Sequence, residues 1–427
     1  MLFSTLMLLL LLLALALPVA GALGVLGLLL DQIHSSMPLT LALGEVAWST
    51  SQDFLLVAIP MFILLGEILL RAGVAERMYA AMADWLSWLP GGLMHSNIGA
   101  CTVFAATSGS SVATAATVGT VSLPLIERYG YNERLFLGTL AAGGTLGILI
   151  PPSINMIIYA VLTDTSIPRL YLAGIIPGLG MALTFMALVF VLCLLRPGWG
   201  GRRPPATWSQ RIASLPSLLP PIGIFLVVVG SIYAGLATPT EAASLGVVAA
   251  LGLAWAYGKL SIRMLKEVFE SAMRTTAMVM LIIVASYFLN FVISAIGLTT
   301  LLTDFIRGLG LTQAQMLIAV VLFYLVLGCF METLSMMITT IPIVAPVMFA
   351  LGFDPIWFGI VMVILLEMAL ITPPVGLNLF VVQSLRSRGP MTDVMVGSFP
   401  FVLIMLLTII LLALFPGLAV WLPGLLT

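Results

Sequence analysis

The chain has 427 residues, of which 61% are hydrophobic and only 8% are charged, and its formal net charge is −1. A soluble domain carries about 25% charged residues, so this composition excludes an ordinary soluble protein and predicts an all-α integral membrane protein. The near-zero charge gives no sign of a nucleic-acid partner. The chain has no G-x-S-x-G, H-E-x-x-H or Walker motif, which disfavours an intramembrane enzyme or a nucleotide-driven pump.

A helix that crosses a bilayer needs about 20 apolar residues. Segments that meet this criterion cover residues 2–30, 53–72, 135–163, 168–195, 216–234, 239–257, 277–296, 355–385 and 396–425. The first has no Lys or Arg before it and is about twice as long as the apolar core of a signal peptide. We therefore predict a membrane helix there, bent near Pro18 and Gly21.

Two further apolar segments, 92–126 and 314–350, are interrupted in the middle by polar residues. Within the first, residues 104–120 contain seven Ser or Thr and no charged residue. Such a run of neutral oxygens in lipid predicts the tip of a re-entrant hairpin that binds a cation and a substrate. Short amphipathic segments at 75–89 and 298–309 precede the hairpins, and we predict that they lie along the membrane interface as arms.

The distribution of Lys and Arg predicts the orientation of the chain. The segment 31–52 has no basic residue and is expected outside, whereas the Gly- and Pro-rich linker with Arg196, Arg202, Arg203 and Arg211 is expected in the cytoplasm. The amino terminus is then cytoplasmic and the carboxyl terminus is periplasmic. By the same argument the first hairpin enters from the cytoplasm and the second from outside.

The chain also contains an internal repeat. A shift of 222 positions superposes Pro124 on Pro346, Gly130 on Gly352, Phe136 on Phe358, and Pro151-Pro152 on Pro373-Pro374. Because the two copies run in opposite directions through the membrane, they predict an inverted-topology repeat, which is common in secondary transporters.

We predict that the repeats cover residues 1–205 and 206–427. The first comprises scaffold helices 2–72, arm 75–89, hairpin 92–126, broken helix 135–163 and helix 168–195. The second comprises scaffold helices 216–296, arm 298–309, hairpin 314–350, broken helix 355–385 and helix 396–425.

Each repeat has a long apolar segment that a double proline interrupts. Unwound backbone within a membrane is tolerated only where it lines a cavity or binds a ligand. Free carbonyls at half-helix carboxyl ends suit Na⁺, and half-helix amino ends suit an anion. We therefore expect Na⁺ as a coupling ion, with no organic cofactor and no transition metal.

The candidate ligands lie at the hairpin tips and at the helix breaks. A first Na⁺ site is expected among Ser108, Ser110, Ser111, Gly144, Gly147 and Pro151. A second is expected among Gly328, Glu332, Thr333, Thr372, Pro373 and Gly376. Substrate contacts are expected from Ser153, Asn155 and Asn378. The alternative is that these small and hydroxylated residues only allow helices to pack closely.

Five motifs carry a resemblance to a known family. They are Ile59-Pro-Met-Phe-Ile-Leu-Leu-Gly66, Ser108-Gly-Ser-Ser-Val-Ala113, Gly144-Thr-Leu-Gly-Ile-Leu-Ile-Pro-Pro-Ser153, Ala237-Thr-Pro-Thr-Glu-Ala242 and Thr372-Pro-Pro-Val-Gly-Leu-Asn378. By these motifs the whole chain resembles the large membrane subunit of the tripartite ATP-independent periplasmic (TRAP) transporters, a DctM- or SiaM-like permease. Glu67 departs from the pattern, because the position after the motif glycine is usually polar and uncharged.

This resemblance implies an elevator-type fold like that of the ion transporter superfamily, in the inner membrane of a bacterium. It implies Na⁺-coupled import of a small organic acid such as a C4-dicarboxylate, sialic acid or a keto acid. It also implies two partners, a small four-helix membrane subunit (DctQ/SiaQ-like) and a periplasmic substrate-binding protein (DctP/SiaP-like). No four-helix block precedes residue 1, so we expect the small subunit to be a separate chain.

Two alternatives stay open. A stand-alone Na⁺/anion symporter of the divalent-anion or arsenite-permease type shares hairpins and inverted repeats. The segment Thr238-Pro-Thr-Glu241 and the unpaired helix 216–234 favour the TRAP permease over it. A non-transporting membrane scaffold is the other alternative, but a scaffold has no use for two broken helices with polar tips.

Overall fold

The computed structural model describes residues 1–15, 17–202, 206–374, 376–386 and 388–426. The described part is helical from end to end and contains no strand beyond one isolated bridge between Tyr131 and Gly200. The predicted repeat boundary at 205, the predicted cytoplasmic Arg203, and Val375 in the second helix break lie outside the described residues.

Within the described residues, seven helices are long and apolar enough to cross a membrane. They are Phe54–Arg71 (ending in α4), Ile167–Leu195 (α11), Trp208–Tyr233 (α12 and α13), Pro239–Ala256 (α14), Ile262–Ala295 (α15), Thr333–Ala350 (α18) and Met391–Leu414 (α21). The pair Glu133–Leu149 (α9) and Ile154–Thr163 (α10), bent by 43°, makes an eighth if it is counted as one span. The protein is therefore a multi-pass membrane protein.

Prolines divide two segments that the sequence presents as single helices. The first consists of α1 (Leu2–Ala14) and α2 (Val19–His34), and Pro18 caps α2 with extended backbone. The last consists of α21 and α22 (Gly417–Leu426), with Pro416 between them. The first division falls at Pro18, where the sequence predicts a bend, whereas the last segment was predicted to be one helix. Both divisions arise because proline cannot continue the helical hydrogen bonding that precedes it.

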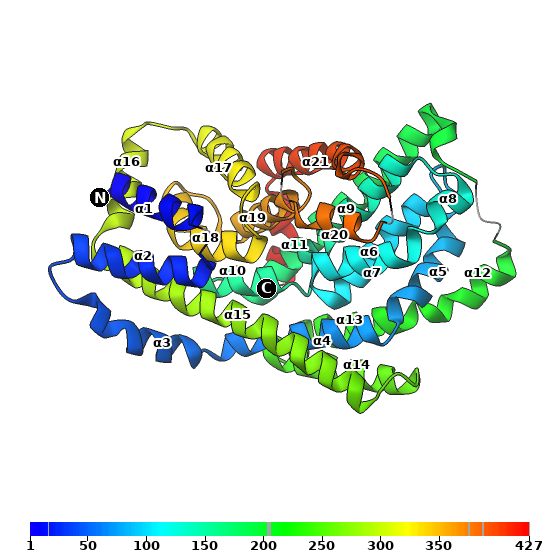
Figure 1. The fold of residues 1–427 in the computed structure, drawn as a ribbon, viewed down its shortest axis with the longest axis horizontal. Coiled ribbons are helices and arrows are strands. Elements are labelled where there is room, and N and C mark those ends of the chain that lie inside the picture. Colours follow the sequence, from blue (N-terminus) through cyan, green and yellow to red (C-terminus); the bar gives the residue numbers. More distant parts are fainter. Residues whose placement is uncertain (16, 203–205, 375, 387, 427) are drawn as a thin grey trace.

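Long helices form a layer along one long edge of the molecule (Figure 1). This layer contains α2, α3 (Leu43–Ser51), α4 (Ala58–Arg71), α13 (Leu219–Tyr233), α14 and α15. Helix α15 packs against α2, α3 and α4, and α14 packs against α4 and α13. These helices lie where the sequence predicts scaffold, and α3 falls in segment 31–52, which the charge distribution was expected to place outside the membrane.

The two predicted hairpins are pairs of helices. The first joins α6 (Leu93–Ser108) to α7 (Ser111–Ser122), followed by the short α8 (Leu125–Tyr129). The second joins α17 (Gln313–Gly328) to α18, which continues through Pro342 and Pro346. That each pair enters and leaves the membrane on one side stays a prediction. The predicted arms correspond to α5 (Val74–Leu86) and α16 (Leu298–Gly308).

The two predicted repeats interlock through their broken helices. The second broken helix consists of α19 (Pro355–Ala369) and α20 (Leu377–Ser384). Helix α7 packs against α9 of its own repeat and α20 of the other, and α18 packs against α19 of its own repeat and α10 of the other. Each hairpin is therefore held between one half of each broken helix, and the hairpins approach the centre from opposite ends (Figure 1).

Candidate functional site

The tips of both hairpins line one cavity of about 170 Å³. Residues 108–113 supply the first wall, and Glu332, Thr333 and Leu334 supply the second. The scaffold contributes Glu67 of α4 and Thr275 of α15. Two segments that are far apart in the sequence thus meet at the boundary between the scaffold layer and the interlocked hairpins.

Three helix amino termini converge on this cavity. The lining includes Ser111 and Val112 from the first turn of α7, Asn155 from that of α10, and Thr333 from that of α18. The first-turn N–H groups of a helix have no intrahelical partner and carry a partial positive charge. No Lys, Arg or His lines the cavity within the described part of the chain. The backbone therefore provides the positive potential that an anion would meet here.

The three amino termini are not equivalent. The Glu332 carboxylate caps α18, accepting bonds from the backbone N–H groups of Leu334 at 3.0 Å and Ser335 at 3.1 Å. Helix α7 is capped instead by a neutral hydroxyl, since Ser110 Oγ accepts from Ala113 N at 3.4 Å. A resident carboxylate already compensates the amino end of α18, which leaves the ends of α7 and α10 for an external anion.

The first hairpin tip fits closely against the first broken helix. The Ser111 hydroxyl donates to the Thr145 carbonyl at 3.3 Å. A Cβ on Gly147 would lie 3.0 Å from the carbonyl carbon and oxygen of Ser110, and a Cβ on Gly109 would lie 3.1 Å from the Pro152 carbonyl oxygen. A side chain at either position would require the neighbouring backbone to shift by a few tenths of an ångström, and Gly109 also has a φ of +60°, which favours glycine.

The other predicted ligands of the first Na⁺ site surround this contact. Ser108 Oγ lies 3.0 Å from Thr114 Oγ1, so the tip is braced internally. Gly144 lies beside Ala115 and the Asn378 side chain, where a Cβ would come within 2.7 Å of the Ala115 Cβ. Pro151 lies in the break between α9 and α10. The structure thus brings Ser110 and Ser111 against Gly147 and Thr145 of α9, and that these residues hold Na⁺ stays a prediction.

In the second predicted Na⁺ site, fewer of the predicted ligands contact one another than in the first. Gly328 at the end of α17 lies against Ala369, and the Cys329 thiol donates to the Pro373 carbonyl at 3.2 Å. Thr372 bonds within its own segment, donating to Met368 O at 2.6 Å, and Gly376 caps α20 with φ of +51°. Glu332 and Thr333 bond to each other, with Thr333 Oγ1 donating to Glu332 Oε1 at 3.0 Å.

The three residues predicted to contact substrate differ in position. Asn155 lines the cavity, and its side-chain nitrogen is buried with no hydrogen-bond partner among the described residues. Ser153 is fully buried and caps α10, accepting from Met156 N at 3.3 Å. Asn378 is also fully buried and donates to the Ala141 carbonyl at 3.1 Å, and it is not part of the cavity lining. Asn155 is therefore the strongest candidate for a substrate contact.

Glu67 braces the scaffold side of the cavity. Its carboxylate accepts a bond from Ser271 of α15 at 2.8 Å and pairs with Arg71 one turn later on α4. Arg71 also lies 3.9 Å from Glu267 of α15. The unusual charge at position 67 thus ties α4 to α15 where the hairpin tips meet the scaffold.

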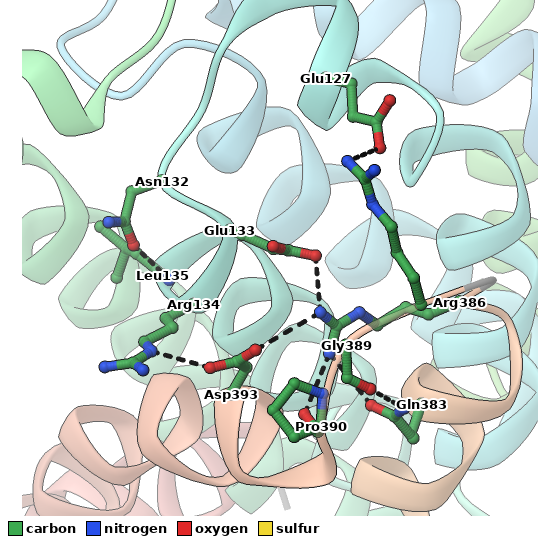
Figure 2. A network of polar contacts seen from close by, with 11 residues as sticks. Glu127, Asn132, Glu133, Arg134, Leu135, Gln383, Arg386, Gly389, Pro390 and Asp393 are labelled. Atoms are coloured by element: carbon green, nitrogen blue, oxygen red, sulfur yellow. Dashed lines mark hydrogen bonds and ion pairs between the residues drawn. The ribbon is translucent and has the colours of Figure 1, made fainter.

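A cluster that the sequence did not reveal joins the repeats away from the cavity. Figure 2 shows Arg386, after α20, between Glu133 at the start of α9 and Asp393 at the start of α21. Its side chain is only 4% exposed, and Nη2 lies 2.6 Å from Glu133 Oε1 and 3.6 Å from Asp393 Oδ2. The sequence shows only that these residues are charged, and its basic residues were used to predict the topology. It does not show that the three side chains meet.

The described residues contain no group of three or more His, Cys, Asp or Glu side chains that could hold a metal ion. Any cation at this site would therefore depend on hydroxyl, carbonyl and single carboxylate oxygens. Such oxygen ligands suit hard cations better than soft transition metals.

Comparisons with known proteins agree on one family. The family described as "Tripartite ATP-independent periplasmic transporter, DctM component" matches residues 6–418. The chain is 34% identical to the C4-dicarboxylate TRAP transporter large permease protein DctM of Pseudomonas aeruginosa, over 95% of this chain and 93% of that protein. It is 32% identical to the ectoine TRAP transporter large permease protein TeaC of Halomonas elongata, over 87% and 86% of the two chains.

A solved structure has a similar fold. The YdaH transporter of Alcanivorax borkumensis, described as having an unusual topology, superposes with a TM-score of 0.64. The alignment covers 88% of this chain and 87% of that one at 14% sequence identity. At this identity the likeness concerns the fold alone.

Proposed function

Because the chain belongs to the DctM family and is a large permease subunit of a tripartite ATP-independent periplasmic transporter, we propose that it imports a small organic acid together with Na⁺. The two partners would be a small DctQ/SiaQ-like membrane subunit and a DctP/SiaP-like periplasmic binding protein. The membrane would be the bacterial inner membrane, with the amino terminus in the cytoplasm and the carboxyl terminus in the periplasm.

The convergence of helix amino termini on the central cavity carries the proposal. A carboxylate placed between the ends of α7 and α10 would accept bonds from first-turn N–H groups and from the Asn155 side-chain amide. Helix dipoles favour an anion at these ends. Because Glu332 already compensates α18, a substrate with one carboxylate near α7 and α10 suits the cavity best.

The close fit of each hairpin tip to a helix break supports Na⁺ coupling. Ser110 and Ser111 would supply oxygens at the first site, together with the carbonyls near Gly147. Thr333 and the carbonyl of Pro373 would contribute at the second. Carbonyls at the carboxyl ends of half-helices favour a cation.

The arrangement of layers supports an elevator mechanism. The hairpins and broken helices interlock as one body, and the cavity lies between that body and helices α4 and α15. Movement of this body past the scaffold would carry the cavity across the membrane. The hydrogen bond between Glu67 of α4 and Ser271 of α15 lies within the scaffold layer and would stay intact during this movement.

The decisive experiment is reconstitution into liposomes. The purified permease is combined with a DctQ/SiaQ-like small membrane subunit and a DctP/SiaP-like binding protein, and uptake of radiolabelled acids is measured. We expect uptake only with an inward Na⁺ gradient and with both partners. Uptake without the binding protein would indicate a stand-alone symporter, and uptake that is independent of Na⁺ would overturn the coupling. The names of related permeases mention C4-dicarboxylate, sialic acid and ectoine, and these are the first compounds to test.

A further inference from the structure

Two consecutive residues of α15, Ser286 and Tyr287, join the scaffold layer to the interlocked body of hairpins and broken helices. The Ser286 hydroxyl donates to the carbonyl of Ile338 in α18 at 2.8 Å. The Tyr287 hydroxyl donates to the carbonyl of Val161 in α10 at 3.0 Å. Helix α15 also packs against α18 (Figure 1). One short stretch of the scaffold thus binds both the second hairpin and the first broken helix.

The carbonyl of Ile338 lacks the partner that an α-helix normally provides. In a regular helix it would accept a bond from the N–H of residue 342, but that residue is a proline inside α18. Ser286 is only 2% exposed, so this contact lies in the interior. A buried carbonyl without a partner is unfavourable, and the Ser286 hydroxyl supplies the missing donor.

The carbonyl of Val161 needs a partner because it lies at a helix end. Val161 is in the last turn of α10, which ends at Thr163. The N–H of Thr165, which would continue the helix, donates instead to Ala160 O at 2.9 Å. The last carbonyls of a helix depend on donors from outside it, and the Tyr287 hydroxyl is such a donor. Both scaffold hydroxyls therefore bind carbonyls that the body's own helices leave free.

These two bonds distinguish one position of the body from another. The hydrophobic effect is non-directional, so an apolar boundary changes little in free energy when one apolar neighbour replaces another. A hydrogen bond, in contrast, needs a donor–acceptor distance of about 3 Å and a nearly straight angle. Movement of the body along α15 by a single helical turn, about 5.4 Å, would break both bonds.

In the observed position, the cavity lies near one end of the scaffold helices. Glu67 and Leu70, in the last turns of α4, line it together with Thr275 of α15. Arg71 and Arg274 follow and precede these residues in the sequence, and the charge distribution is expected to place both in the cytoplasm. On the proposed orientation, the cavity therefore lies near the cytoplasmic side of the membrane.

We propose that the hydroxyls of Ser286 and Tyr287 form a latch, which holds the body in this position and opens in every transport cycle. The latch rests on the elevator movement proposed above. Removing either hydroxyl takes a hydrogen bond from the observed position and none from a position in which that bond is already broken. The population should therefore shift toward the second position, because a change that destabilises one of two states favours the other.

Single-molecule energy transfer between a dye on the scaffold and a dye on the body tests the latch. Lys259, before α15, and Arg128, in α8 after the first hairpin, are both exposed and are replaced by cysteine for labelling. Half-buried Cys329 is replaced by serine, and the other two cysteines are buried. The full-length permease is reconstituted in liposomes with a DctQ/SiaQ-like subunit. We expect two transfer efficiencies, one for each position of the body.

Ser286→Ala and Tyr287→Phe should each raise the ratio of the second position to the observed one about two- to tenfold, the factor that one net hydrogen bond provides. Ser244→Ala is the matched control, because that scaffold hydroxyl donates to Thr240 O of its own helix α14 at 3.1 Å. An unchanged ratio in both latch variants, or an equal rise in the control, would overturn the latch. A single transfer efficiency in wild type and in every variant would refute the elevator movement itself, and the latch with it.

Thiol accessibility separates a latch from a merely structural contact. Val112 lines the cavity and is 38% exposed, so Val112→Cys reports the side to which the cavity opens. With Ser286→Ala or Tyr287→Phe added, a membrane-impermeant thiol reagent should modify this cysteine about two- to tenfold faster in intact cells, and more slowly in inside-out vesicles. A loosened structure would react faster from both sides, and that result would contradict the latch. Tyr287→Phe keeps the aromatic ring, so it tests the proposal even if Ser286→Ala does not fold.

Discussion

The Arg386 guanidinium lies 2.6 Å from Glu133 Oε1, although the two residues are 253 positions apart in the sequence. Arg386 follows α20 in the second repeat, and Glu133 begins α9 in the first (Figure 2). Asp393 at the start of α21 lies 3.6 Å from the same guanidinium nitrogen. One nearly buried side chain thus joins both broken helices into one body, which an elevator mechanism requires.

Replacing Arg386 should weaken that body. We expect Arg386→Ala to lower the free energy of unfolding by about 1–3 kcal/mol, the range for losing hydrogen bonds to buried charged groups. Arg388→Ala is the matched control, because Arg388 is 72% exposed and its partner Glu127 is 69% exposed. The control should change stability by no more than about 0.5 kcal/mol. Thermal unfolding of the two variants in the same detergent measures these changes. Equal losses of stability in Arg386→Ala and Arg388→Ala would contradict a special role for Arg386.

Closing the space at Gly147 should separate the hairpin tip from the break. An alanine Cβ there would lie 3.0 Å from backbone atoms of Ser110, which cannot move as a side chain could. We expect Gly147→Ala to reduce Na⁺-driven uptake at least tenfold. Gly180→Ala on α11 has open space around its Cβ and should transport as wild type does. Normal uptake by Gly147→Ala would show that transport does not need this close approach.

The hydroxyls of the two tips should set the Na⁺ dependence. Ser110→Ala and Thr333→Ala should each raise the Na⁺ concentration for half-maximal uptake several-fold while the protein still assembles. Loss of the long Ser110 cap bond should cost only about 0.5–1 kcal/mol. Thr117→Val on α7 is the control, because that hydroxyl bonds to Ala113 O of its own helix at 2.7 Å. Unchanged Na⁺ titrations in both tip variants would remove these residues from the ion sites.

Asn155 should affect substrate more than stability. Its side-chain nitrogen has no partner in the described structure, so Asn155→Leu breaks no hydrogen bond of that nitrogen and should leave thermal unfolding unchanged or improved. Uptake should show a KM raised at least tenfold. Asn97→Leu is the contrast, because Asn97 donates to Thr139 at 3.0 Å and accepts from Tyr79 at 3.0 Å. That variant should lose about 1–3 kcal/mol of stability; an unchanged KM in Asn155→Leu would exclude the substrate contact.

Cysteine labelling should establish the orientation. Ser36 and Lys259 are both exposed, and the charge distribution places them outside and inside, respectively. Cys101 and Cys193 are buried, so replacing the half-buried Cys329 by Ser removes the reactive background. A membrane-impermeant maleimide added to intact cells should label Ser36→Cys and not Lys259→Cys. The reverse pattern would invert the predicted topology.

Much of this protein follows from local sequence. Composition alone predicts a helical membrane protein, since apolar helices satisfy their own backbone in lipid. The 222-residue repeat and the two Pro-Pro pairs predict where broken helices occur, because proline acts on its immediate neighbours. The sequence does not distinguish a bent helix from two separate helices, because a proline is the signal for both. The structure shows separate helices at Pro18 in the first segment and at Pro416 in the last.

Tertiary structure decided what the polar residues do, because burial and partners depend on helices that are distant in sequence. Asn155 and Asn378 look alike in the sequence, yet only Asn155 lines the cavity. Ser110 and Glu332 occupy equivalent positions in the repeat, yet the Glu332 carboxylate is already engaged by its own helix. Glu67 and Glu367 are both acids in apolar segments. Glu67 pairs with Arg71 and accepts a bond from Ser271, whereas no described side chain bonds to Glu367, so the free energies of burying the two side chains must differ.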